Sequence, residues 1–260
     1  PMKTTLFAGA SVGLCILASA TAASAQSIDY GAMEQLFNEP VTTSATGSPQ
    51  RSTEVPVDMQ IISAAEIKRS GASDLPAILS RVAGLDVLNW GAAGADVSVR
   101  GYNQAMSPRL LVLINGRQVY LDHYGYTAWA TLPVQLDEIR QIEVVKGPNS
   151  ALFGFNAVGG VVNIITRTGH GPLRLSAQAA LGNLGSREAS ADLAGSFQAW
   201  DLALSASGAR SSGVSAVRPG DRFGLYNPDA DGFERTDYST RLGYTFRPGQ
   251  RLGVALNGGE

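Results

Sequence analysis

Residues 188–206 read Glu-Ala-Ser-Ala-Asp-Leu-Ala-Gly-Ser-Phe-Gln-Ala-Trp-Asp-Leu-Ala-Leu-Ser-Ala, and this segment indicates how the C-terminal part of the chain folds. On both sides of Gln198-Ala199, apolar or small side chains alternate with polar ones. An alternation with period two is typical of a β-strand that has one apolar face and one polar face. We therefore predict two antiparallel strands that meet at a tight turn near Gln198-Ala199.

The same alternation recurs before and after this stretch, in residues 173–181, 238–247 and 251–257. Each run has about the length of a tilted strand that crosses a bilayer. Short connections at 198–199 and 247–250 contrast with a long polar loop at 211–235. Three aromatic residues stand at the short-turn end, where an outer-membrane barrel carries an aromatic girdle: Phe197, Trp200 and Phe246. A soluble β-sandwich also alternates, but the loop asymmetry and the aromatic placement favour a membrane barrel.

The first residues predict a cleaved export signal. Residues 2–25 combine Lys3, an uncharged stretch and the small residues Ala23-Ser24-Ala25, as a secretory signal does. The alternative is a membrane anchor, but the dense apolar part is too short to span a bilayer. Cleavage after Ala25 removes Cys15, the one cysteine of the chain. One cysteine excludes an internal disulfide framework and a multi-cysteine zinc site, and a net charge of −2 argues against a nucleic-acid binder.

Between the signal and the alternating strands lie two further regions. Residues 26–54 are polar and predict a flexible arm. Residues 55–168 predict a compact α+β domain, because strand patterns enclose two short helices. The first helix begins at a capping box of Ser63 and Glu66 and ends at Gly71. The second begins at Ser73 or Asp74 and runs to about Val82.

The strands of this α+β domain are marked by apolar runs, and one pair by its turn. Asn115-Gly116 separates two strand patterns and predicts a hairpin with a type I′ turn, since both residues tolerate positive φ angles. The expected strands are residues 57–62, 85–88, 97–100, 110–114, 117–120, 142–146 and 161–166.

The α+β domain resembles the plug domain of the TonB-dependent outer-membrane receptors of Gram-negative bacteria. Six blocks carry the resemblance in order and spacing: Ile67–Ala72, Val82–Val87, Val99–Asn103, Leu111–Tyr120, Ile139–Pro148 and Ala157–Thr166. The resemblance implies an α+β plug followed by the first antiparallel strands of a transmembrane β-barrel, which is 22-stranded in this family. The expected divisions are a signal peptide at 1–25, an arm at 26–54, the plug at 55–168 and about five strands of an incomplete barrel at 172–260; the chain is expected to continue past Glu260.

The resemblance also implies a function, namely energised import of a scarce ligand across the cell outer membrane. The ligand class is a ferric siderophore, haem or cobalamin, and the plug and arm face the periplasm. The implied partners are the energy-transducing protein TonB, outer-membrane lipid and a metal-chelate or similar small molecule, with no nucleic acid. The alternative is a surface barrel or adhesin that does not transport. We expect no enzymatic activity, since no nucleophile elbow or phosphate loop is present, and we expect no catalytic residue, metal site or resident cofactor.

In this family a short segment before the plug, the TonB box, pairs with TonB. The candidate here comprises seven residues: Glu39, Pro40, Val41, Thr42, Thr43, Ser44 and Ala45. Its extended, β-prone character suits the addition of a strand to the edge of a partner. An ordinary linker is the alternative reading.

Two further groups of residues are implied by the resemblance. A plug–barrel lock is expected at Arg100 and Lys146, with Glu143 as a possible internal partner; Lys146 replaces the usual arginine and loses its forked geometry. The alternative is surface charges at strand ends. The ligand-contact candidates are Tyr102, Asn103, Tyr120, Tyr124, Tyr126 and Trp129, because aromatic rings stack on planar ligands. These rings equally suit packing against the barrel wall.

Overall fold

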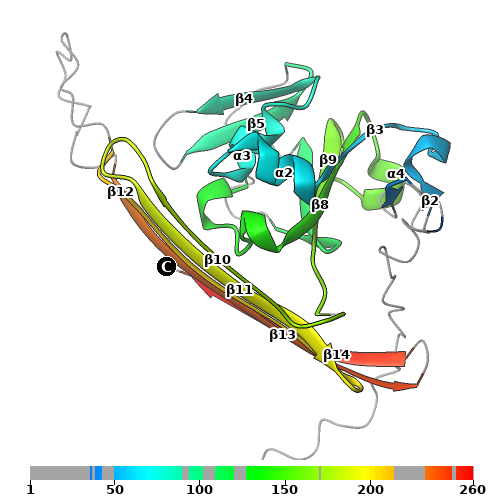
Figure 1. Ribbon diagram of the computed structural model, residues 1–260. Helices are drawn as coiled ribbons and strands as arrows, with labels where there is room; N and C mark the ends of the chain where they lie inside the picture. Colours follow the sequence, from blue (N-terminus) through cyan, green and yellow to red (C-terminus); the bar gives the residue numbers. More distant parts are fainter. Residues whose placement is uncertain are drawn as a thin grey trace, which may run out of the picture.

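A computed structural model describes residues 36, 39–42, 50–89, 94–101, 109–119, 127–169, 171–213, 232–247 and 250–259. Figure 1 shows two bodies: a long curved sheet of strands β10 to β14, and an α+β domain that lies on one side of it. We call the sheet the wall and the α+β domain the plug. Among the described residues, no helix is long and apolar enough to cross a membrane.

The plug is built on a mixed sheet with the strand order β3-β8-β9-β6-β7. The strands are β3 Asp58–Ser63, β8 Ile139–Lys146, β9 Gly160–Thr166, β6 Leu110–Ile114 and β7 Arg117–Gln118. Strands β6 and β9 are parallel and the other pairs are antiparallel. The central strands β8 and β9 are largely buried on both faces. Strand β9 is accordingly mostly apolar, whereas β8 also carries polar residues such as Gln141 and Glu143.

Short helices and a hairpin cover one face of this sheet. The helices are α2 Ala64–Ser70 and α3 Leu75–Leu79, and the hairpin pairs β4 Leu85–Asn89 with β5 Ala95–Val99. Their apolar side chains join those of the sheet in the main core, which includes Ile78 and Leu79. Smaller elements complete the plug: α4 Ser150–Phe153 and the 3₁₀ turns η1 Ser52–Glu54, η2 Trp129–Thr131 and η3 Leu136–Glu138.

Most of the predicted local signals of the plug are confirmed. Ser63 and Glu66 form the capping box of α2, and Gly71 ends that helix with φ 65°. Asn115 and Gly116 both have positive φ angles, 51° and 78°, as the type I′ turn requires. Helix α3 ends at Leu79 rather than near Val82, because the next N–H groups bond three residues back instead of four: Arg81 N–H donates to Ile78 O at 3.2 Å and Val82 N–H to Leu79 O at 3.0 Å.

The wall is a meander of five antiparallel strands joined in sequence order. They are β10 Arg174–Leu181, β11 Arg187–Phe197, β12 Trp200–Ser211, β13 Phe233–Arg247 and β14 Gln250–Gly259. Phe197 pairs with Trp200, which confirms the tight turn at 198–199. The Trp200 and Tyr244 rings lie 4.7 Å apart on the outer face, at the same end of the sheet.

The two faces of the wall differ as the alternation predicts. Large apolar side chains point away from the plug; Leu175 is 74% exposed and Leu252 is 69% exposed. Polar side chains such as Asp201, Ser205 and Ser239 point toward the plug and are buried. In a membrane, such a sheet offers its apolar face to lipid.

The connection from the plug to the wall passes very close to strand β12. A Cβ atom added to Gly169 would lie 2.6 Å from both the N and the O of Leu202. That distance is far below van der Waals contact, so the backbone approach at this point requires glycine.

The capping box makes the stability of α2 depend on pH. Two hydrogen bonds from Ser63, one from its N–H and one from its hydroxyl, lower the pKa of Glu66. A lowered folded pKa adds stability that is complete above the ordinary pKa of glutamate and is lost as pH falls through the folded pKa. We expect Ser63→Ala to weaken α2 by about 1 kcal/mol, which is about fivefold faster amide hydrogen exchange in residues 64–70. Glu66→Gln can still cap, so it should remove the pH dependence while largely keeping the helix; an unchanged pH profile in that variant would contradict the assignment.

Candidate functional site

The N-terminal segment lies against the plug as part of a small two-stranded sheet. Strand β1 Val41–Thr42 pairs with β2 Gln50–Arg51, and both residues of β1 are buried. The Gln141 side chain on β8 donates a hydrogen bond of 2.9 Å to Val41 O. The Ser52 N–H donates to Pro40 O at 3.0 Å, and the Glu39 carboxylate accepts from Thr53 Oγ1 at 3.0 Å.

This packing differs from the flexible arm expected over residues 26–54. The candidate TonB box residues Glu39, Pro40, Val41 and Thr42 are held by backbone pairing and by Gln141. Thr43, Ser44 and Ala45 lie outside the described residues. The physical reason is that Val41 is apolar and sits beside an extended partner, so it gains both burial and main-chain hydrogen bonds by docking.

The predicted lock cations come together on the plug. Arg100 lies 3.2 Å from Asp58 Oδ2, and Lys146 Nζ lies 3.0 Å from Asp58 Oδ1. Lys146 also donates to Ala83 O at 3.2 Å. Sequence reasoning did not single out Asp58, because no motif marks it and the pairing joins β3 to residues far along the chain.

Glu143, the suggested internal partner, has a different position. It lies three residues before Lys146 on β8, and an odd spacing puts two strand residues on opposite faces. Its buried carboxylate accepts from Gln141 Nε2 at 2.6 Å, on the face that the N-terminal segment covers. The carboxylate beside Lys146 is thus Asp58 and not Glu143.

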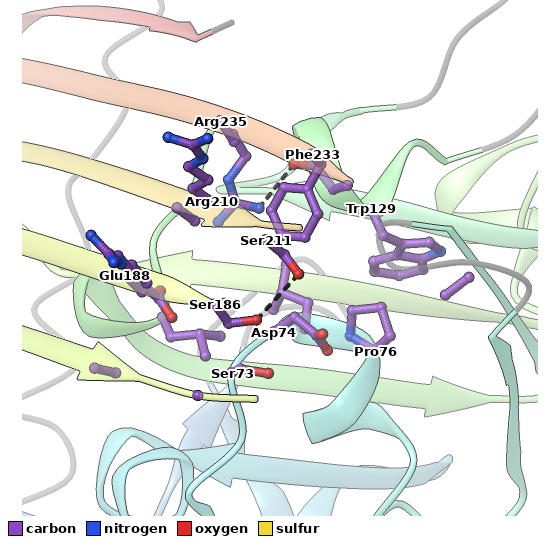
Figure 2. A pocket seen from close by; sticks show the side chains of 18 of the residues that line it. Ser73, Asp74, Pro76, Trp129, Ser186, Glu188, Arg210, Ser211, Phe233 and Arg235 are labelled. Carbon is purple, nitrogen blue, oxygen red and sulfur yellow. Dashed lines mark hydrogen bonds between the residues drawn. The ribbon is translucent and has the colours of Figure 1, made fainter. Parts of the chain in front are cut away.

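A cavity of 520 Å³ lies between the plug and the wall, at the end of the wall that carries the longer loop (Figure 2). Its apolar lining includes Pro76, Trp129, Leu132 and Phe233. Its charged lining consists of Asp74, Arg187, Glu188, Arg210 and Arg235. Arg235 crosses toward the plug and donates to Ala130 O at 2.9 Å. This mixture of apolar walls with a few polar groups is typical of a small-molecule site.

One predicted ligand-contact residue lines this cavity. Trp129 does so from η2, yet only 7% of it is exposed and it packs in the main core. Asn89 and Ala95, which pair at the end of the β4–β5 hairpin, also line it. Tyr102, Asn103, Tyr120, Tyr124 and Tyr126 lie outside the described residues.

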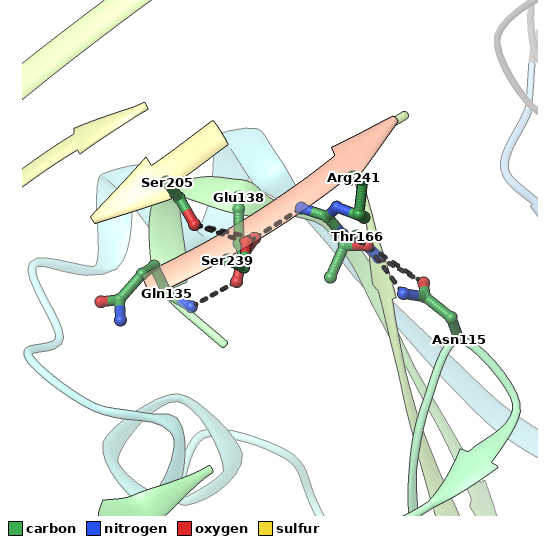
Figure 3. Close-up of polar contacts among 7 residues, drawn as sticks. All are labelled: Asn115, Gln135, Glu138, Thr166, Ser205, Ser239 and Arg241. Carbon is green, nitrogen blue, oxygen red and sulfur yellow. Dashed lines mark hydrogen bonds and ion pairs between the residues drawn. The ribbon is translucent and has the colours of Figure 1, made fainter. Parts of the chain in front are cut away.

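The plug is attached to the wall by a buried polar cluster around Glu138 (Figure 3). Glu138 ends η3 and is 5% exposed. Its Oε2 lies 2.5 Å from Arg241 on β13 and accepts from Ser239 and Ser205 at 3.1 and 3.3 Å. Its Oε1 accepts from the Gln135 N–H at 2.8 Å. Both carboxylate oxygens therefore have donors, as a buried carboxylate requires.

Arg241 also ties a second part of the plug to the wall. Besides Glu138 it donates to Thr166 Oγ1, at the end of β9. Thr166 is fixed by Asn115, whose Nδ2 donates to Thr166 Oγ1 at 2.8 Å. We call Glu138, Arg241, Ser205, Ser239 and Thr166 the anchor cluster.

Further polar contacts flank the anchor cluster along the wall. Asp137 accepts from Gln178 on β10 and from Ser190 on β11, the latter at 3.1 Å. Gln135 donates to Asp237 on β13 at 3.2 Å. In this ion pair the plug supplies the carboxylate of Glu138 and the wall supplies Arg241, whereas the expected lock has its cations, Arg100 and Lys146, on the plug. In the sequence, the Asp137-Glu138 pair stands directly before strand β8. Acidic residues at such a position are ordinarily assumed to be exposed to solvent, so the sequence did not indicate this contact.

The described residues contain no group of three or more His, Cys, Asp or Glu that could hold a metal ion. The Asn227–Gly232 segment, whose oxygen spacing resembles the start of a calcium loop, lies outside that part of the chain except for Gly232.

Comparison with known proteins gives the family context of this geometry. The sequence profile of the TonB-dependent receptor plug domain matches residues 51–161. The vitamin B12 transporter BtuB of Photobacterium profundum is 30% identical over 246 residues, which is 93% of this chain and 37% of that protein. The vitamin B12 transporter BtuB of Vibrio vulnificus is 34% identical over 154 residues, 58% of this chain and 24% of that protein.

Two solved structures show the same fold. The ferripyoverdine receptor of Pseudomonas aeruginosa matches with a TM-score of 0.68 at 16% identity, over 84% of this chain and 27% of that one. The ferric enterobactin receptor of the same organism matches with a TM-score of 0.60 at 23% identity, over 80% of this chain and 33% of that one. The chain thus spans between about a quarter and two fifths of the length of the curated relatives.

The anchor cluster predicts how the plug responds to loss of one charge. Arg241→Gln leaves the Glu138 carboxylate buried without its cation, so we expect plug docking to weaken by about 3–5 kcal/mol. The double variant Glu138→Gln/Arg241→Gln should cost less than the sum of the two single variants, since they share one interaction. Amide hydrogen exchange at residues 136–139 in the receptor measures the effect.

The matched control is Arg251→Gln. Arg251 makes a similar ion pair of 2.5 Å with Asp201, but both residues belong to the wall. The Arg251→Gln variant should perturb β12 and β14 and leave amide hydrogen exchange at residues 136–139 unchanged. Equal protection loss in the control and in Arg241→Gln would refute the anchor role.

Proposed function

Because this chain belongs to the TonB-dependent receptor family, we propose that the whole protein imports a scarce metal-chelate ligand across the bacterial outer membrane. In this proposal the wall is the start of a barrel, the plug closes its lumen, and TonB supplies the energy by pulling the N-terminal segment. The surface-adhesin alternative leaves the docked N-terminal segment without a purpose.

The observation that carries the proposal is the connection of the N-terminal segment to the anchor cluster through one strand. Gln141 holds Val41, and Glu138, three residues earlier in the chain, contacts Arg241 of the wall. Force applied to β1 therefore acts on the start of β8, which is the place where the plug is fixed to the wall. Strand β1 is two residues long and pairs with the equally short β2, so its release requires few hydrogen bonds to break.

The membrane orientation follows from loop lengths in this proposal. Short turns face the periplasm and longer loops face outward in outer-membrane barrels. In Figure 1, β2 lies toward the end of the wall where β13 turns into β14, a short connection. This arrangement supports a plug and N-terminal segment that reach the periplasm, where TonB can bind, and an outer wall face in contact with outer-membrane lipid.

The ligand class is inferred from the relatives and from the cavity. The curated relatives described above are vitamin B12 transporters, so cobalamin is the first ligand to test, and ferric siderophores and haem are the next. The cavity in Figure 2, with its apolar walls and charged rim, is consistent with part of an entry route on the outer side of the plug.

Because the N-terminal segment is docked on the plug, we predict that a change that weakens this docking strengthens the binding of TonB. Gln141→Leu removes the donor to Val41 O, so β1 should detach more often and the receptor should bind the periplasmic domain of TonB more tightly. Val41→Pro removes a main-chain donor and should abolish binding and uptake, since strand addition needs that N–H. Isothermal titration of the receptor with the TonB domain measures both.

The outcome that contradicts energised transport is specific. If neither the receptor nor a peptide of residues 26–50 binds the TonB domain, the coupling proposal fails. Uptake of labelled cobalamin or ferric siderophore by cells that carry the complete gene, with and without TonB, then decides the ligand.

A further inference from the structure

The outer face of the wall changes from apolar to charged at the end that carries the longer loop. Outward positions alternate along each strand, so the register places Arg187 of β11 directly opposite Arg210 of β12. Glu234 of β13 faces Arg210 from the other side, and Leu181 of β10 faces Arg187. All four side chains are exposed. Leu181, Arg187 and Arg210 also border the cavity between plug and wall, because they lie at the ends of their strands. Two like charges side by side repel each other unless an anion lies between them.

The distance from the aromatic end places these arginines at a membrane surface. Trp200 and Arg210 lie ten positions apart on β12. At about 3.4 Å per residue and a tilt of about 45°, this separation spans roughly 24 Å along the membrane normal. The apolar band of outer-membrane barrels is about 25 Å tall. With Trp200 in one interface, Arg210 and Arg187 therefore reach the lipid headgroups of the other.

The surface directly below the arginine pair is shallow and apolar. The register pairs Ala189 with Gly208 and Ala191 with Ala206, so the next two rows carry only small side chains. Larger side chains border this area: Leu181 at 85% exposure and Tyr238 at 57%. Acyl chains can lie on such a surface while the guanidinium groups stay at headgroup level.

From this arrangement we propose that Arg187 and Arg210 bind a phosphate group of an outer-leaflet lipid, whose acyl chains lie over the small residues below. Guanidinium groups fit phosphate oxygens through paired hydrogen bonds. The phosphate neutralises the repulsion of the two arginines, and Glu234 limits the site to a single anion. This inference rests on the membrane placement in the proposed function.

The test compares lipid binding to the full-length receptor in detergent by native mass spectrometry. The probes are dioleoyl phosphatidic acid and dioleoylglycerol, which differ only in the phosphate. We expect Arg187→Ser/Arg210→Ser to bind phosphatidic acid at least about tenfold more weakly than the unaltered receptor. Dioleoylglycerol should bind both equally, and millimolar inorganic phosphate should not displace the lipid.

The matched control is Arg174→Ser/Arg247→Ser, which removes two exposed arginines at the short-turn end. It should bind phosphatidic acid as the unaltered receptor does. Glu234→Gln should bind the same lipid more tightly, and this variant keeps the proposal testable if the double variant does not fold. Equal affinities of Arg187→Ser/Arg210→Ser and the unaltered receptor, or an equal loss in the control, would overturn the site.

Ligand uptake separates this site from the proposed function. If the receptor shows no ligand uptake and still keeps the phosphate-dependent difference in lipid binding, only the transport proposal is contradicted. A receptor that transports normally but shows no phosphate dependence contradicts the lipid site alone.

Discussion

The structure depends on one constraint, which is that an alternating strand with an apolar outer face must have a polar inner face. Residues such as Ser205, Ser239 and Asp237 are polar for this reason, and the plug covers them. A covered polar group needs a hydrogen-bond partner. The plug surface that meets the wall must therefore be polar as well, and Gln135, Asp137 and Glu138 fulfil this requirement.

The place where these three residues lie links two parts of the molecule. They stand in and directly before η3, and β8 begins with the next residue, Ile139, which is fully buried. One strand thus starts at the wall contact, passes beneath Val41 at Gln141, and ends at Lys146 beside Asp58. A change in the N-terminal segment can reach the wall along this strand without rearranging the apolar core on its other face.

Local chemistry made much of the fold predictable. The capping box at Ser63, the Asn115-Gly116 turn and the alternation around Gln198-Ala199 each act within a few residues, so the sequence displays them directly. Contacts between distant residues were not predictable in this way. Asp58 meets Arg100 and Lys146, and Glu138 meets Arg241, only because the tertiary fold joins them. The docking of Val41 was missed for the same reason, since its partner Gln141 stands 100 residues away.

The close approach of Gly169 to Leu202 has a consequence for exchanging parts between receptors. A chimera that joins this plug to a foreign barrel must place its junction where the incoming chain can pass a strand backbone without a side chain. A junction moved by one residue would put a Cβ atom into that backbone and displace the first strand. The plug and the wall are separate in architecture, but the connection between them allows few positions for a chimera junction.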